Sequence, residues 1–177
     1  MVRRPAPTIV SRRALLLDSA VVVAASSALA GCGFALKHAP ELRFKTIQLT
    51  GFTPRSPLAA ELRMNIDSSL TTRVVESAKD AEVVLHALTD AREKSVVAQT
   101  AANQIREFEL RSRFRFELRT VGGKELIPPT EIVLKRSLTY TESAALAKEQ
   151  EEAFLYRAMQ IDIASQVLRR LASVRLL

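Results

Sequence analysis

The sequence predicts an α+β domain, with a mixed, largely antiparallel sheet of four strands and two helices packed on one face (β-α-β-β-β-α). Residues 108–119 alternate apolar and charged side chains with a period of two, which is typical of a strand with one buried face. Two other segments, after Ser56 and after Ser143, carry apolar residues at helical spacing. Helices that cover one face of a sheet give a two-layer domain.

The domain is expected to begin with a strand and a helix. Residues 44–49 predict the strand, which Gly51 ends. Ser56 followed by Pro57 is typical of a helix start, because Ser can cap and Pro is tolerated at the first helical position. Residues 74–75 either end this helix or begin an extended connection. The apolar stripe of the helix recurs every four residues: Leu58, Leu62, Ile66 and Leu70.

Two strands are expected after this helix. Residues 81–98 are apolar on both faces, which favours a central position in the sheet. A turn at Asn103-Gln104 leads to the clearest strand of the chain. Its apolar face is formed by Phe108, Leu110, Phe114, Phe116 and Leu118. Its charged face is formed by Glu109, Arg111, Arg113, Arg115, Glu117 and Arg119.

A fourth strand and a long helix complete the expected order. Gly122-Gly123 predicts a turn, and Pro128-Pro129 is expected to delay the start of the strand. One face of this strand is formed by Ile132, Leu134, Leu138 and Tyr140. The helix is expected from about Ser143 to Leu171. Its apolar stripe is formed by Leu155, Met159, Ile163, Val167 and Leu171.

The N-terminus has the three parts of a lipoprotein signal. Arginines at positions 3–4 and 12–13 precede an interrupted apolar run, which ends in Leu29-Ala30-Gly31-Cys32. The run is too short to span a bilayer well, which takes roughly 20 apolar residues. The last four residues match the bacterial lipobox, in which small residues leave room for the processing enzymes. We therefore expect cleavage before Cys32, after either the general or the twin-arginine export route.

Cys32 is expected to carry covalent diacylglycerol and an N-acyl chain. It is the only cysteine of the chain, so lipidation explains an otherwise unpaired thiol in a secreted protein. Several acyl chains anchor a protein stably, whereas one binds only marginally. We expect three parts: residues 1–31 as signal peptide, 32–43 as lipidated tether and 44–177 as a single periplasmic α+β domain. Gly33 stands where Asp favours inner-membrane retention, so we expect the periplasmic side of the outer membrane.

The charge balance favours anionic partners. The whole chain has a formal net charge of +7, but residues 1–31 hold four of its 26 basic and one of its 19 acidic residues. The mature chain is therefore only moderately basic, at about +4. In a periplasmic compartment no nucleic-acid partner is expected, and anionic lipid or lipopolysaccharide is the natural candidate.

The sequence offers no constellation typical of catalysis or metal binding. His38 lies in the tether and His86 in a strand, and two isolated histidines lack the usual ligand spacing. No glycine-rich phosphate loop or nucleophile elbow is present. Glu149, Glu151 and Glu152 suit the dipole of a helix start. We expect no enzyme, no metal and no cofactor beyond the lipid on Cys32.

With this layout, the chain resembles the LptE family of lipopolysaccharide-assembly lipoproteins. The resemblance rests on residues 31–37 (GCGFALK), on the order of strands and helices, and on three stretches of the last helix: residues 145–152 (ALAKEQEE), 157–159 (RAM) and 166–171 (QVLRRL). It implies a subunit of the lipopolysaccharide translocon that plugs and helps assemble an LptD-type outer-membrane β-barrel. It also implies binding of lipopolysaccharide during delivery to the outer leaflet.

The resemblance also implies particular binding residues. A basic residue implicated in lipopolysaccharide binding corresponds to Lys148, and a second lies in the loop where Arg106 is the nearest basic residue. The residues themselves suggest a further site, because arginine binds phosphates and carboxylates in bidentate fashion. That site is the charged strand face with Arg111, Arg113, Arg115 and Arg119. The same face is alternatively a contact with the polar lumen of the barrel or a solvated surface.

Two other functional classes remain open from the sequence. One is an auxiliary lipoprotein of a phospholipid-transport ABC system, which shares a small periplasmic α/β architecture. Its depletion would disturb phospholipid asymmetry alone, whereas loss of surface lipopolysaccharide favours the translocon. A hydrolase is the weaker class, and it would require turnover that depends on His86 or on Glu149, Glu151 and Glu152.

Overall fold

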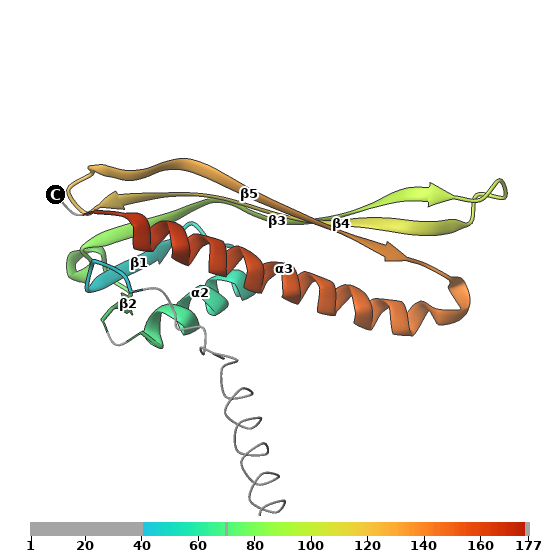
Figure 1. Ribbon diagram of the computed structural model, residues 1–177, viewed down its shortest axis with the longest axis horizontal. Coiled ribbons are helices and arrows are strands. Elements are labelled where there is room, and N and C mark those ends of the chain that lie inside the picture. Colours follow the sequence, from blue (N-terminus) through green and yellow to red (C-terminus); the bar gives the residue numbers. More distant parts are fainter. Residues whose placement is uncertain (1–40, 70, 176–177) are drawn as a thin grey trace, which may run out of the picture. The chain divides into compact units, whose positions relative to one another are not determined.

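The computed structural model describes residues 41–69 and 71–175, which form one α+β unit. A five-stranded sheet has the strand order β2-β1-β3-β4-β5, and both helices lie on the same face of it (Figure 1). The strands are β1 (Thr46–Thr50), β2 (Arg73–Val75), β3 (Val83–Gln99), β4 (Ile105–Thr120) and β5 (Glu125–Thr139). The helices are α2 (Pro57–Asp67) and α3 (Ala145–Ser173), with the short 3-10 helices η1 (Ala78–Asp80) and η2 (Glu142–Ala144).

Several predictions concern residues outside this description. They are the signal peptide at residues 1–31, the lipidated Cys32, His38 with most of the tether, and Leu70 of the first apolar stripe. Within residues 41–69 and 71–175, no helix is both long and apolar enough to cross a membrane.

The sheet corrects the expectation of four largely antiparallel strands. β1 pairs in parallel with both β2 and β3, whereas β3–β4 and β4–β5 are antiparallel. α2 supplies the crossover that two parallel strands require, so β1, α2 and β2 form a β-α-β unit. The extra strand was missed because Arg73–Val75 has three residues, too few to show a period of two.

The start of α2 is as predicted. The Ser56 hydroxyl accepts a hydrogen bond from the Ala59 N–H at 3.1 Å, and Pro57 occupies the first helical position. Ser56 also donates to the Asp90 carboxylate on β3 at 2.5 Å, which links the helix start to the sheet. Leu58, Leu62 and Ile66 are buried, so the described part of the predicted stripe faces the core.

The predicted alternation of β4 is confirmed. Leu110, Phe114, Phe116 and Leu118 are fully buried beneath the helices, and the charged residues between them form the opposite face. β3 is central in the sheet, as expected, but its alternation changes partway. A register shift at Leu88 lets Ala87 pair with Phe116 and Asp90 with Phe114. The even-numbered residues that follow therefore face the helices.

β5 starts earlier than expected. It begins at Glu125, and Pro128-Pro129 lies inside it, where a register shift sets these two residues against one residue of β4. β5 is an edge strand, and prolines are tolerated at edges and bulges because no ladder hydrogen bond is lost there. The prolines therefore bulge the strand without delaying it.

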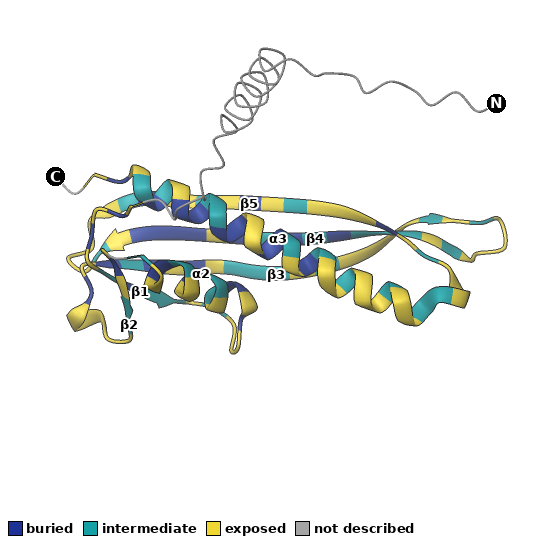
Figure 2. Ribbon diagram, turned by 60° about the horizontal axis from the view of Figure 1, so that its bottom comes forward, coloured by how far each residue is buried: buried dark blue, intermediate teal, exposed yellow. Residues whose placement is uncertain are grey.

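Two groups of buried side chains hold the helices on the sheet. The larger includes residues of β1, β3, β4, β5, α2 and the second half of α3. The smaller contains Leu110, Leu138, Tyr156 and Met159 and lies under the first half of α3. The predicted stripe of α3 is buried from Met159 to Leu171, with Leu155 half-buried. Figure 2 shows that burial is concentrated toward the end where α3 finishes.

Candidate functional site

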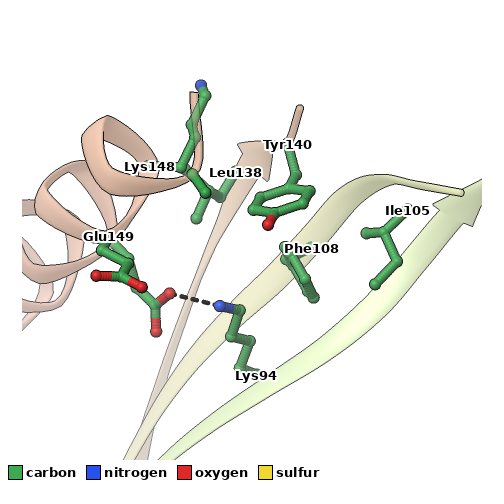
Figure 3. A pocket seen from close by; sticks show the side chains of 9 residues that line it. Lys94, Ile105, Phe108, Leu138, Tyr140, Lys148 and Glu149 are labelled. Atoms are coloured by element: carbon green, nitrogen blue, oxygen red, sulfur yellow. Dashed lines mark hydrogen bonds and ion pairs between the residues drawn. The ribbon is translucent and has the colours of Figure 1, made fainter. Parts of the chain in front are cut away.

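A pocket of about 160 Å³ lies beside the start of α3 (Figure 3). Its other walls come from the last part of β3, the start of β4 and the end of β5. We call it the distal pocket. It is lined by Lys94, Ile105, Phe108, Leu138, Tyr140, Ala145, Lys148, Glu149 and Glu152.

One wall of the distal pocket is apolar. The rings of Phe108 and Tyr140 meet edge to face with centroids 5.3 Å apart, at an interplanar angle of 78°. Leu138 is 1% exposed and anchors this wall in the smaller buried group. Rigid aromatic and aliphatic side chains are suited to contact the methylene groups of a lipid.

Lys94 enters the pocket from β3. Its Nζ lies 4.2 Å from the centroid of the Phe108 ring and 2.6 Å from a Glu152 carboxylate oxygen. Lys94 is a site residue that the sequence pattern does not predict. With uninterrupted alternation from Val83 it would point away from the helices, and only the bulge at Leu88 turns it inward.

The neighbouring Tyr156 stabilises this arrangement. Its hydroxyl donates to the Glu93 carbonyl oxygen at 2.8 Å, and the Arg92 guanidinium lies 5.3 Å from its ring centroid. Burial, followed by the nearby Glu152 carboxylate, raises the pKa of Tyr156 above its usual value. These contacts fix α3 over the end of β3.

Lys148, identified through the family resemblance, lies at the rim of the distal pocket on the first turns of α3. Its side chain is 19% exposed. Nζ donates to the Thr139 hydroxyl at 3.1 Å and pairs with Glu151 at 2.8 Å. The ammonium therefore stands beside the apolar wall, in contact with a carboxylate that is itself 46% exposed.

Arg106 lies close to this pocket. It lines an adjoining hollow of about 250 Å³ together with Ile105 and residues 141–143, and Ile105 also lines the distal pocket. Its carbonyl oxygen accepts a hydrogen bond from the Tyr140 N–H at 2.8 Å. The fold therefore brings Arg106 and Lys148 to the same end of the sheet, although 42 positions separate them in the sequence.

Arg111, Arg113 and Arg115 lie on the opposite face of the sheet from the helices, because they alternate with the buried residues of β4. Arg113 pairs with Glu93 at 2.9 Å. Arg111 pairs with Glu109 at 2.9 Å and with Glu93 at 3.7 Å. Glu93 of the neighbouring β3 and Glu109 of β4 itself thus compensate much of the charge of Arg111 and Arg113.

Lys135 of β5 extends the same network. It lies 3.2 Å from Glu109, and its hydrogen bond, followed by that of Arg111, holds the pKa of Glu109 below its usual value. Arg119 pairs with Glu117 at 2.9 Å. Arg115 has no carboxylate within 4.0 Å among residues 41–69 and 71–175. Of the predicted arginines on this face, Arg115 is therefore the one that makes no ion pair with a described residue, although Glu131 stands opposite it on β5.

His86 is a sheet residue, as expected. Its Nδ1 lies 3.0 Å from the Thr50 hydroxyl, and a side chain at Gly51, where φ is +77°, would collide with the His86 ring and the Ala87 carbonyl oxygen. Glu149 and Glu152 belong to the distal pocket. In the part of the chain that the structure describes, no group of three His, Cys, Asp or Glu side chains could hold a metal ion.

A family model and a related protein that match this chain carry the same family name. A family model described as LptE, lipopolysaccharide-assembly, matches residues 44–171. A protein of Photorhabdus laumondii named LPS-assembly lipoprotein LptE is 26% identical over 162 residues, which covers 90% of this chain and 85% of that protein.

Two solved structures are also similar. Lipoprotein B of Nitrosomonas europaea has a TM-score of 0.67 at 30% identity, covering 80% of this chain and 91% of that one. Rare lipoprotein B of Shewanella oneidensis has a TM-score of 0.61 at 26% identity, covering 73% of this chain and 95% of that one.

Proposed function

The chain belongs to the LptE family of lipopolysaccharide-assembly lipoproteins, and we propose that it binds lipopolysaccharide at the distal pocket while it is assembled with an LptD-type barrel. The family supports a role in lipopolysaccharide transport and fits a protein that is not an enzyme. It also favours this role over service in a phospholipid-transport ABC system.

The position of Lys148 carries the lipopolysaccharide part of the proposal. Its ammonium lies at the rim of a pocket whose wall contains Phe108, Leu138 and Tyr140. Lipopolysaccharide has phosphate groups next to acyl chains, so a cation beside an apolar wall matches both parts of the ligand. Arg106, in the adjoining hollow, is suited to a second phosphate or carboxylate.

The bound phosphate would replace a carboxylate that Lys148 already holds. Exposed ion pairs contribute little free energy, so exchanging the half-exposed Glu151 for a phosphate costs little. Glu149 and Glu152 also line the pocket, so its net charge is not strongly positive. Binding should therefore depend on direct contact with the Lys148 ammonium more than on the overall charge of the site.

The face of the sheet opposite the helices, which carries Arg111, Arg113 and Arg115, would contact the barrel. Its Arg111 and Arg113 already pair with Glu93 and Glu109, an arrangement suited to the mixed polar lining of a barrel lumen. Arg115, in the middle of β4, adds a cation without an ion pair among the described residues. We propose that this face contacts the barrel while the distal pocket holds the glycolipid.

The lipid on Cys32 would hold the domain at the membrane. Anchoring on the periplasmic side of the outer membrane keeps the domain at the membrane that receives the glycolipid. The family is associated with the outer membrane, which agrees with this placement.

The test uses purified mature protein and measures binding of lipopolysaccharide. Lys148→Glu should weaken binding about tenfold or more, since a hydrogen bond to a charged group is lost and a repulsive carboxylate appears. Arg106→Glu should act in the same direction. Arg157→Glu is the matched control, because Arg157 is exposed on α3 and lines none of the pockets described above.

Recovery of the barrel separates the two halves of the proposal. Arg113→Glu combined with Arg115→Glu should reduce co-purification of an outer-membrane barrel after gentle detergent extraction, while the domain stays folded. Unchanged lipopolysaccharide binding by Lys148→Glu would remove the distal pocket from the model. Failure of the native chain to recover any barrel would remove the assembly role.

A further inference from the structure

A second hollow lies at the opposite end of the sheet, where β1 and β2 begin. It has a volume of about 570 Å³. Leu42 and Phe44 line it and are almost fully buried. Arg43, Lys45 and Arg73 line it as well, and all three are exposed. We call these three residues the basic rim.

Unlike the cations of the distal pocket, the basic rim makes no ion pair with any residue that the structure describes. Lys94 and Lys148 each pair with a carboxylate of α3. Within residues 41–69 and 71–175, no carboxylate lies within 4.0 Å of the rim's charged nitrogens. Glu82 is near, but its carboxylate accepts from the Lys45 backbone N–H at 2.9 Å and leaves the ammonium free.

Further cations lie at the same end of the sheet. The β4–β5 turn and the end of α3 both lie there (Figures 1 and 2). The turn contains Lys124, and the last turns of α3 contain Arg169 and Arg170. The backbone places this turn beside the start of β3, because the Val121 N–H donates to the Glu82 carbonyl oxygen at 3.3 Å. Several basic residues therefore lie near the end of the sheet where β1 begins.

The chain length between the basic rim and Cys32 limits their separation. Leu42 follows Cys32 by ten residues, which span at most roughly 35 Å when fully extended. A lipid on Cys32 would therefore keep the basic rim within a short distance of the membrane surface. A lipid chain and a basic patch together bind a membrane more firmly than either does alone.

We propose that Arg43, Lys45 and Arg73 form a docking surface for the anionic phospholipid headgroups of the leaflet that holds the lipid anchor. The exposed cations contact phosphates, and the hollow between them admits a headgroup. Because the distal pocket lies at the other end of the sheet, this docking directs that pocket away from the leaflet surface. This docking is independent of lipopolysaccharide binding, since it involves a different ligand and different residues.

The experiment measures co-sedimentation of the mature chain with vesicles. Cys32→Ser removes the lipid, so that only the folded domain can bind. The Cys32→Ser protein with no other change should bind vesicles that contain both phosphatidylcholine and phosphatidylglycerol. It should bind vesicles of phosphatidylcholine alone only weakly. Lys45→Glu with Arg73→Glu should reduce binding to the anionic vesicles by about tenfold or more, because each cation near an anionic surface adds substantially to binding.

The matched control is Arg55→Glu with Arg157→Glu, which changes the net charge by the same amount at exposed positions away from the basic rim. The control should retain most of the binding. Equal losses in both variants, or binding that does not depend on phosphatidylglycerol, would overturn the proposal. Circular dichroism checks the fold, and the neutral pair Lys45→Gln with Arg73→Gln should give an intermediate loss.

Discussion

At the residue scale, the charged groups of this domain differ in whether the chain itself compensates them. Arg111 and Arg113 share the Glu93 carboxylate of β3, and Arg111 also pairs with Glu109 of its own strand, whereas Arg115 and the basic rim make no ion pair among residues 41–69 and 71–175. The register of β3 and β4 places Glu93 opposite Arg111, whereas Arg115 forms no ion pair although Glu131 stands opposite it on β5. A count of arginines along β4 cannot make this distinction.

Glu109 offers a test of the compensating network. Its pKa is lowered by hydrogen bonds from Lys135 and then Arg111, so its stabilisation is present above the ordinary carboxyl pKa and is lost as pH falls through the lowered value. Glu109→Gln should therefore lose less stability on acidification than the native chain, measured as the midpoint of urea unfolding at several pH values.

The control for this experiment is Glu107→Gln on the same strand. Glu107 makes no ion pair with a described residue, so its substitution should leave the acid dependence nearly unchanged. Parallel pH profiles for the native chain and Glu109→Gln would contradict the proposed contribution of Glu109.

At the scale of elements, two bulges decide which side chains reach the sites. The bulge at Leu88 turns Asp90, Arg92 and Lys94 toward the helices, where they contact Ser56, Tyr156 and Glu152 respectively. The bulge at Pro128-Pro129 keeps an edge strand continuous despite two prolines. A one-residue change of register moves every later side chain to the other face.

Ser56 connects α2 to β3, and its removal tests that connection. Ser56→Ala should lower the free energy of unfolding by about 1–2 kcal/mol, because the helix loses its cap and the Asp90 carboxylate loses a buried donor. Ser68→Ala, at the exposed end of the same helix, should cost less than about 0.5 kcal/mol. Equal costs in chemical denaturation would show that the link to Asp90 contributes nothing.

At the scale of the whole domain, the two groups of buried side chains are unequal in size. The larger joins both helices to four strands, and the smaller joins only α3 to β4 and β5. Regions with fewer buried apolar contacts open locally at lower free energy. The distal pocket therefore lies in the part of the domain that is expected to open more easily, which would suit the proposed binding of a glycolipid there.

Hydrogen exchange measures this difference directly. Amides of residues 92–99 and 105–110 should exchange faster than those of residues 83–87 and 114–118, although both sets lie in the same strands. Met159→Ala should widen the difference, since it removes a fully buried side chain from the smaller group. Uniform protection along β3 and β4 would mean that the domain opens only as one unit.

Much of the fold was predictable because the relevant signals are local. The period of two in β4, the Ser56–Pro57 helix start and the long stripe of α3 each extend over enough residues to be read without knowledge of neighbours. β2 was missed because three residues carry no periodicity, and the parallel pairing of β1 depends on which strand edge the chain reaches after α2.

The sequence by itself determined the α+β class, the two helices, the buried face of β4 and, through the family resemblance, Lys148 as a candidate site residue. Only the tertiary structure decided that Lys148 and Arg106 line adjoining hollows at one end of the sheet and that Lys94 lines the same pocket as Lys148. It also decided that Arg43, Lys45 and Arg73 line a separate hollow at the other end. The physical reason is that periodicity depends on the chain's own geometry, whereas register, bulges and strand order depend on contacts between residues far apart in the sequence.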